Sequence, residues 1–166
     1  LGGMIAPAYA LKYPKHVLAL GLFSTAADRT KDDREKILAV IKSMEEQGVS
    51  KVLPTLIDRW FTDSFISSSP DIIERRIQQV INTDPEIFMN VFRIYANTEM
   101  GPWLHKINFP TLILTGEKDG GCNPKLNKFI ADQIPNSKLV ILPNYKHSLL
   151  IETPNEIAEN IINFFN

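Results

Sequence analysis

The chain has 166 residues, of which 44% are hydrophobic and 22% charged, a composition typical of a globular domain large enough to bury a core. Its 18 basic and 19 acidic residues are scattered and leave a net charge of −1, so we expect neither nucleic acid nor a membrane surface as a partner. The single cysteine, Cys122, excludes an internal disulfide and fits a reducing compartment, which predicts a cytoplasmic location.

The first part of the chain predicts a helix, a strand and a block of helices. Residues 1–13 are rich in Ala and predict a helix that Pro14 closes and that Pro7 kinks, because proline inside a helix removes a hydrogen bond. The apolar run 17–23 is typical of a strand buried on both faces and is too short to span a bilayer. After this run no strand pattern appears before residue 100. Helices are predicted at 32–47 and 50–61, and two more begin at Ser69-Pro70 and Asp84-Pro85.

The pattern changes at residue 110. Strands are predicted at 110–116 and 138–143, with a helix at 123–134 between them and a last helix that opens with a capping box, Thr153 to Glu156. Strands that alternate with crossover helices predict a parallel sheet and an α/β fold. The helical block interrupts this alternation like an inserted cap. We therefore expect a core at 1–27, a helical cap at 28–103 and more core at 104–166.

The loops that follow the three predicted strands carry the candidate chemistry. Asp28 follows the first strand, Asp119 lies in "GEKDGGCNP" after the second, and His147 lies in "PNYKHSLLIE" after the third. In open parallel sheets the functional groups lie just beyond the carboxyl ends of the strands. An acid and a histidine in neighbouring loops can meet there, and a carboxylate that fixes one imidazole tautomer makes that histidine a general base.

These segments resemble the C-terminal part of an α/β-hydrolase, and the 3-oxoadipate enol-lactonases in particular. The resemblance extends over the whole chain through "LGGMIA", "YPKHVLALGLFSTA", "RWFTDSF", "PTLILTGEKD" and "KHSLLIETP". Leu1 and Gly2 match the last two positions of the G-x-S-x-G elbow that carries the nucleophile in this fold. The resemblance thus implies a serine immediately before Leu1, the backbone N–H of Leu1 in the oxyanion hole, Asp119 as the acid and His147 as the base.

The implied function is hydrolysis of small carboxylic esters or lactones, with no metal and no organic cofactor. A chain that carries the acid and the base but no nucleophile should be inactive alone. Hydrolysis of a C–C bond in ring-cleavage products uses the same triad and is an alternative. A non-catalytic fragment or binding module is another. Asp28 is a rival acid, because some members of the family carry theirs after the strand that precedes the cap.

Other residues receive narrower expectations. Trp60 and Trp103 are candidates to line an apolar acyl pocket, and Arg59, or else Arg93, to bind the carboxylate of an enol-lactone. Cys122 is expected to be a small packing residue without an activating partner. His16 and His105 are read as surface residues, and the wide spacing of the three histidines argues against a metal site. The resemblance leaves the first strand without its neighbour, so we expect self-association, or pairing with an N-terminal half, through the open sheet edge.

Overall fold

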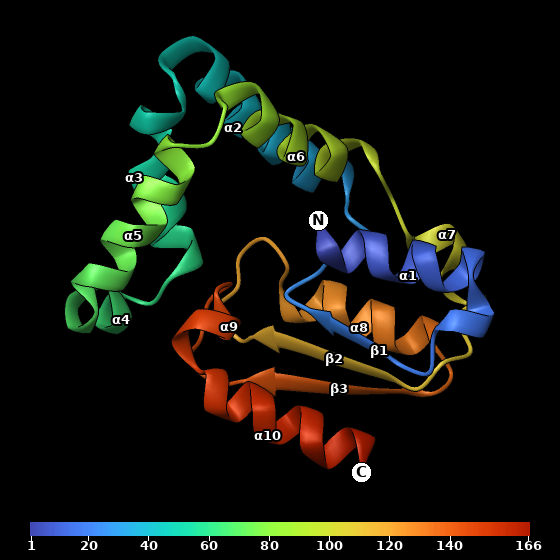
Figure 1. The fold of residues 1–166 in the computed structure, drawn as a ribbon. Coiled ribbons are helices and arrows are strands. Elements are labelled where there is room, and N and C mark those ends of the chain that lie inside the picture. Colours follow the sequence, from blue (N-terminus) through green and yellow to red (C-terminus); the bar gives the residue numbers. More distant parts are fainter. The chain divides into compact units, whose positions relative to one another are not determined.

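A computed structural model describes all 166 residues, which form two compact units. The first unit, Leu1–Asp28 together with Glu99–Asn166, contains the sheet (Figure 1). The second, Arg29–Thr98, is entirely helical. Asp28 and residues 99–103, predicted to belong to the cap, group with the sheet-bearing unit, in which α7 (Gly101–Leu104) packs against α8 (Pro124–Gln133). The helical block as a cap over an active site stays a prediction.

The sheet has three parallel strands in the order β1 (Leu20–Phe23), β2 (Thr111–Gly116) and β3 (Ser137–Leu142). All six residues of β2 are buried, as expected for a strand with neighbours on both sides. The predicted α/β fold with parallel strands and crossover helices is therefore confirmed.

Helices cover both faces of this sheet. α1 (Gly2–Lys12) and α8 lie on one side, and α10 (Pro154–Phe165) lies on the other (Figure 1). The core between the sheet and α10 contains Leu112 and Leu114 of β2 and Ile157 of α10. None of the helices is both long and apolar enough to cross a membrane.

The first strand is shorter than the apolar run that predicts it. Residues 14–16 form a 3₁₀ turn, and β1 begins only at Leu20, whose N–H donates to the carbonyl of Pro110. Pro110 has no N–H to extend the ladder further. The prediction of a strand buried on both faces is wrong for this segment, because Leu18 is 92% exposed. The edge of β1 away from β2 carries no strand.

The helical unit consists of α2 (Lys31–Gln47), α3 (Val49–Trp60), α4 (Asp63–Ser68), α5 (Pro70–Ile81) and α6 (Pro85–Asn97). It has a core of its own, which includes Met44, Leu53 and Phe61. Thr30 and Asp33 form a capping box that begins α2, and the Asp84 side chain caps α6. The predicted absence of strands from this block is confirmed.

One local expectation fails in detail. α1 continues to Lys12 with Pro7 inside it and ends just before Pro14, and a kink at Pro7 stays a prediction. Thr153 precedes α10 as predicted, but its side chain accepts no capping bond. Thr153 also ends the short helix α9 (Leu149–Glu152), where its N–H donates to the carbonyl of Leu149, and its backbone has the φ and ψ of neither an extended nor a helical residue. Thr153 thus ends one helix and precedes the next, and the predicted capping box does not form.

Candidate active site

Asp119 and His147 meet beyond the carboxyl ends of two neighbouring strands. Asp119 follows β2 and His147 follows β3, and these strands pair in parallel up to Gly116 and Leu142. The Nδ1 atom of His147 lies 2.8 Å from Oδ2 of Asp119, a hydrogen-bond distance. The structure thus brings together the acid and the histidine that the sequence selects.

The Asp119 carboxylate is held in a fixed orientation. Its second oxygen, Oδ1, accepts hydrogen bonds from the backbone N–H groups of Gly121 at 2.9 Å and Cys122 at 2.8 Å. The side chain is 2% exposed, whereas the imidazole of His147 is 38% exposed. A buried carboxylate therefore anchors an imidazole that remains accessible from outside.

The pair favours the charged form of both groups. Burial raises the pKa of Asp119, but the hydrogen bond and charge of His147 and the two backbone N–H groups lower it more, so it stays below its usual 3.8. Burial likewise lowers the pKa of His147, but hydrogen bonds to Asp119 and Cys122 and the nearby negative charge raise it above the usual 6.5. This environment stabilises an imidazolium, the form that a general base adopts after it takes a proton.

The pKa shifts predict how the pair contributes to stability. The Asp119 contribution is present above pH 3.8 and is lost as the pH falls through the lowered pKa. The His147 contribution is fully present below pH 6.5 and is lost as the pH rises through the raised pKa. We therefore expect His147→Gln to destabilise the chain most between pH 3.8 and pH 6.5, where both contributions are fully present. Urea unfolding of both proteins at about pH 5 and about pH 9 measures this, and an equal difference at the two pH values would contradict it.

Close backbone packing fixes the loop that carries His147. The carbonyl groups of Tyr145 and Lys146 lie directly against the Cα of Gly116, where a Cβ would come within 2.7 Å of the Tyr145 carbonyl carbon. The N–H of Lys118 donates to the Tyr145 carbonyl at 2.8 Å. Ser24, at the end of β1, donates from Oγ to the carbonyl of His147 at 2.8 Å. All three strand ends therefore position the histidine.

Cys122 lies against the pair. Its Sγ is within 4.8 Å of ligating atoms of both Asp119 and His147, so the expectation of a thiol with no partner beside it is wrong. Its carbonyl accepts hydrogen bonds from Thr115 Oγ1 and Asn127 Nδ2, each at 2.7 Å. Asn127 is fully buried and also donates to the carbonyl of Thr25 at 2.9 Å, which links the loop after β1 to the acid loop.

Leu1 and the glycines after it begin α1. The Leu1 carbonyl accepts the first hydrogen bonds of the helix, from Met4 and Ile5. Gly3 lies so close to Thr25 that a Cβ there would be 2.5 Å from the threonine Oγ1, so only glycine allows this approach of helix and loop. A place for the N–H of Leu1 in an oxyanion hole stays a prediction.

The rival acid is elsewhere. Asp28 is exposed, has a φ of 61° and donates its N–H to Oε1 of Glu99. The carboxylate that hydrogen-bonds to His147 is that of Asp119, not that of Asp28. His16 and His105 are both exposed, and Nδ1 of His16 lies 3.4 Å from the hydroxyl of Tyr9.

The candidate substrate-binding residues lie in both units. Arg59 and Trp60 end α3 in the helical unit, where Arg59 is exposed and the indole of Trp60 lies 5.2 Å from the guanidinium of Arg76. Arg93 is ion-paired with Glu45 and Glu86 within the same unit, which already balances its charge. Trp103 is half-buried in α7, in the sheet-bearing unit. Contact of Trp60, Arg59 or Trp103 with a substrate stays a prediction.

Comparison with known proteins assigns the chain to a family. Residues 1–154 match the family described as serine aminopeptidase, S33. The chain belongs to this family. The chain is 25% identical over its whole length to 3-oxoadipate enol-lactonase 2 of Acinetobacter baylyi and covers 62% of that protein. It is 26% identical over 96% of its length to the proline iminopeptidase PfmaB of Pestalotiopsis fici, of which it also covers 62%.

Solved structures share this fold. The enol-lactonase from Burkholderia xenovorans LB400 superposes with a TM-score of 0.89 at 20% identity, over 98% of this chain and 62% of that one. A thermophilic esterase from Thermogutta terrifontis superposes with a TM-score of 0.81 at 25% identity, over 98% and 60%. The chain thus spans about three-fifths of the length of these proteins. The resemblance to an α/β-hydrolase of the enol-lactonase-like branch is confirmed.

Proposed function

We propose that Asp119 and His147 are the acid and base of a serine hydrolase that acts on small carboxylic esters or lactones. The observation that carries this proposal is the 2.8 Å hydrogen bond from His147 Nδ1 to a buried, doubly anchored carboxylate. Similarity to an enol-lactonase and an esterase supports the substrate class. The nucleophile in this proposal is a serine directly before Leu1, so the chain alone has no hydrolytic activity.

The reaction follows from the tautomer that Asp119 imposes. With a proton on Nδ1 directed at the carboxylate, Nε2 accepts the proton of the serine hydroxyl as its oxygen attacks the carbonyl carbon. The negative charge on the carbonyl oxygen is stabilised by backbone N–H groups, including that of Leu1 at the start of α1, each worth about 3 kcal/mol of barrier. His147 then returns the proton to the leaving oxygen, and water releases the acyl group by the same steps in reverse. These steps require only side chains, backbone and water.

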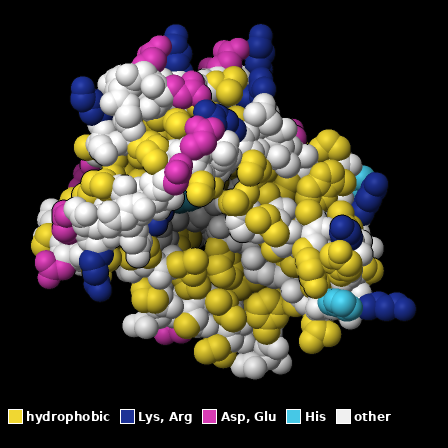
Figure 2. Space-filling view, turned by 45° about the horizontal axis from the view of Figure 1, so that its top comes forward, with side chains coloured by type: hydrophobic (Ala, Val, Ile, Leu, Met, Phe, Trp, Pro, Cys, Tyr) yellow, Lys and Arg dark blue, Asp and Glu magenta, His cyan; other side chains and the backbone are white.

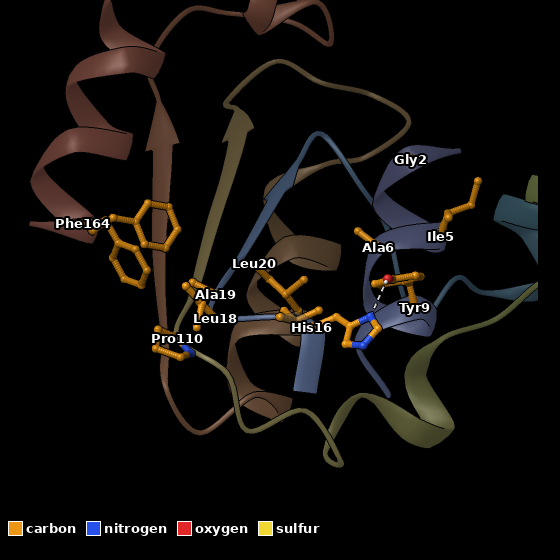
Figure 3. A pocket seen from close by; sticks show the side chains of 12 residues that line it. Gly2, Ile5, Ala6, Tyr9, His16, Leu18, Ala19, Leu20, Pro110 and Phe164 are labelled. Carbon is orange, nitrogen blue, oxygen red and sulfur yellow. Dashed lines mark hydrogen bonds between the residues drawn. The ribbon is translucent and has the colours of Figure 1, made fainter. Parts of the chain in front are cut away.

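The sheet edge supports the proposal that further strands complete this hydrolase. A groove of about 1030 Å³ follows the outer side of β1. In Figure 3, residues 18–20 lie in its middle, with Ile5, Ala6 and Tyr9 of α1 on one side and Phe164 of α10 on the other. Hydrophobic side chains also form a broad area with few charged groups in the space-filling view (Figure 2). We infer that strands of the same fold, in the same polypeptide or in a separate chain, cover this groove.

The open edge predicts association of the isolated chain. An uncovered strand edge flanked by apolar side chains pairs readily with another copy. We expect sedimentation velocity to show reversible oligomers whose fraction grows with concentration, and Leu18→Lys to reduce them. Ile87→Lys, at a 63% exposed position in the helical unit, is the matched control and should leave association unchanged. A chain that stays monomeric at all concentrations would contradict the edge argument.

A substrate panel tests the proposed activity. The protein extended by its upstream coding sequence should hydrolyse p-nitrophenyl esters or enol-lactones, and the chain that starts at Leu1 should hydrolyse neither. Turnover of vinylogous diketones alone would identify C–C bond hydrolysis instead, and turnover of prolyl anilides alone a peptidase. No turnover of any acyl substrate by the extended protein would favour a non-catalytic binding module.

A further inference from the structure

Three metal-ligating side chains converge beside the candidate active site. The ligating atoms of Asp119, Cys122 and His147 all lie within 4.8 Å of one another. Asp119 and Cys122 are buried, at 2% and 5% exposure, and the imidazole is partly exposed. The spacing of the histidines in the sequence argues against a metal site, but it misses this cluster, in which one histidine joins a thiol and a carboxylate.

We propose that Asp119, Cys122 and His147 form a three-ligand site for a thiophilic divalent cation of the zinc class. Zinc in proteins binds Cys, His and Asp tetrahedrally, with bonds of about 2.0–2.3 Å that place neighbouring ligand atoms about 3.3–3.7 Å apart. The pair of Asp119 Oδ2 and His147 Nδ1 is closer than this at 2.8 Å, and every other pair is within 4.8 Å. Shifts of about 1 Å therefore bring the three side chains into coordination, with the fourth position for water.

Surrounding hydrogen bonds hold two of the ligands in place. Oδ1 of Asp119 keeps its bonds to the N–H groups of Gly121 and Cys122, so Oδ2 is the oxygen that turns to the metal. The carbonyl of Cys122 is fixed by Thr115 and by buried Asn127. Outer contacts of this kind orient ligands and raise metal affinity. The His147 side chain is 38% exposed, so one of the three ligands is accessible to solvent.

The donor set selects the ion. A thiolate with an imidazole favours zinc and its soft relatives, whereas magnesium and calcium prefer oxygen ligands alone. On binding, the metal replaces the thiol proton of Cys122 and the proton shared by His147 and Asp119, and both protons pass to the solvent. The thiolate and the carboxylate then balance the double positive charge.

Such a site has a consequence that rests on the proposed function. A metal that binds Asp119 and His147 breaks their hydrogen bond and removes the base from its role. Zinc-class ions would therefore inhibit the hydrolase at its acid and base, and Cys122 sets that sensitivity without taking part in the reaction.

Cadmium titration of the full chain tests the site without any assay of hydrolysis. Cys122 is the only cysteine, so an ultraviolet thiolate-to-cadmium absorption band reports on this side chain alone. We expect the band to saturate at one equivalent and to be unaffected by excess magnesium. Cys122→Ser should abolish it, and His147→Gln and Asp119→Asn should each weaken binding at least about tenfold. His105→Gln, at an exposed histidine outside the cluster, is the control and should change nothing.

X-ray absorption at the zinc edge of the unmutated chain gives a second readout that needs no variant. We expect one sulfur ligand at about 2.3 Å and nitrogen or oxygen ligands at about 2.0 Å. Absence of the thiolate band, a band that His147→Gln and Asp119→Asn leave unchanged, or a zinc shell without sulfur would overturn the proposal. If the chain binds cadmium as expected but the extended protein hydrolyses no ester or lactone, only the proposed function is contradicted.

Discussion

Asp119→Asn in the protein extended by its upstream sequence is expected to lower kcat for an ester or lactone by roughly 10⁴-fold, with little change in KM. The amide no longer stabilises an imidazolium, and it holds the histidine in the wrong tautomer, with the proton on the nitrogen that should accept one. Both effects act on the transition state, not on substrate binding. Steady-state kinetics with the substrate identified by the panel measures the change.

Asp28→Asn is the matched control for this prediction. Asp28 is the rival acid from the sequence, but it is exposed and is not the residue that His147 contacts. We expect less than a twofold change in kcat, on the scale of ordinary surface substitutions. If Asp28→Asn instead costs as much as Asp119→Asn, or if Asp119→Asn costs less than about tenfold, Asp119 is not the acid.

Gly116→Ala is expected to destabilise the chain by about 3 kcal/mol, at the upper end for overpacking. The added methyl would collide with the backbone carbonyl groups of Tyr145 and Lys146, which cannot rotate away as a flexible side chain can. The least costly relief moves the loop that carries His147, so the hydrogen bond to Asp119 should lengthen as well. Urea unfolding measures the loss, and the ¹⁵N signals of the imidazole report the change in that hydrogen bond.

Gly120→Ala is the control for steric crowding. Gly120 lies four residues after Gly116, in the loop that follows β2, and a methyl there meets nothing within 4 Å. We expect its free energy of unfolding to change by less than about 0.5 kcal/mol. Equal effects at the two glycines would show that loop flexibility, and not the close approach at Gly116, determines the result.

The sequence was sufficient to predict the central pair because one geometric rule applies to it. Asp119 and His147 each lie in a loop that directly follows an apolar run. Parallel neighbouring strands end at the same edge of a sheet, so the two loops are neighbours. The same logic gave the α/β class and the all-helical block. Periodicity located the long helices to within about a residue or two, but it missed α4, α7 and α9, which are too short to show a period.

The supporting contacts could not be predicted, because they join positions far apart in the chain. Ser24 is 123 residues from His147, and Asn127 is 102 residues from Thr25. Serine and asparagine have no periodic pattern that would mark such a role. The approach of Cys122 to His147 likewise depends on the fold, which places the acid loop beside the loop that follows β3.

The first strand shows a different limit. An apolar run predicts burial but does not say which polypeptide covers it. Leu18 belongs to the run and is almost fully exposed in this chain. Its hydrophobicity therefore fits a surface that another element covers, and not the interior of the sheet-bearing unit alone.

Labelling with a fluorophosphonate tests the central claim most directly, because this reagent reacts with a serine that a histidine activates. The extended protein should be labelled at a serine immediately before Leu1, located by mass spectrometry of the digested protein. Asp119→Asn and His147→Gln should prevent the reaction, and the chain that starts at Leu1 should stay unlabelled. Labelling of that shorter chain, or of a serine elsewhere, would contradict the account.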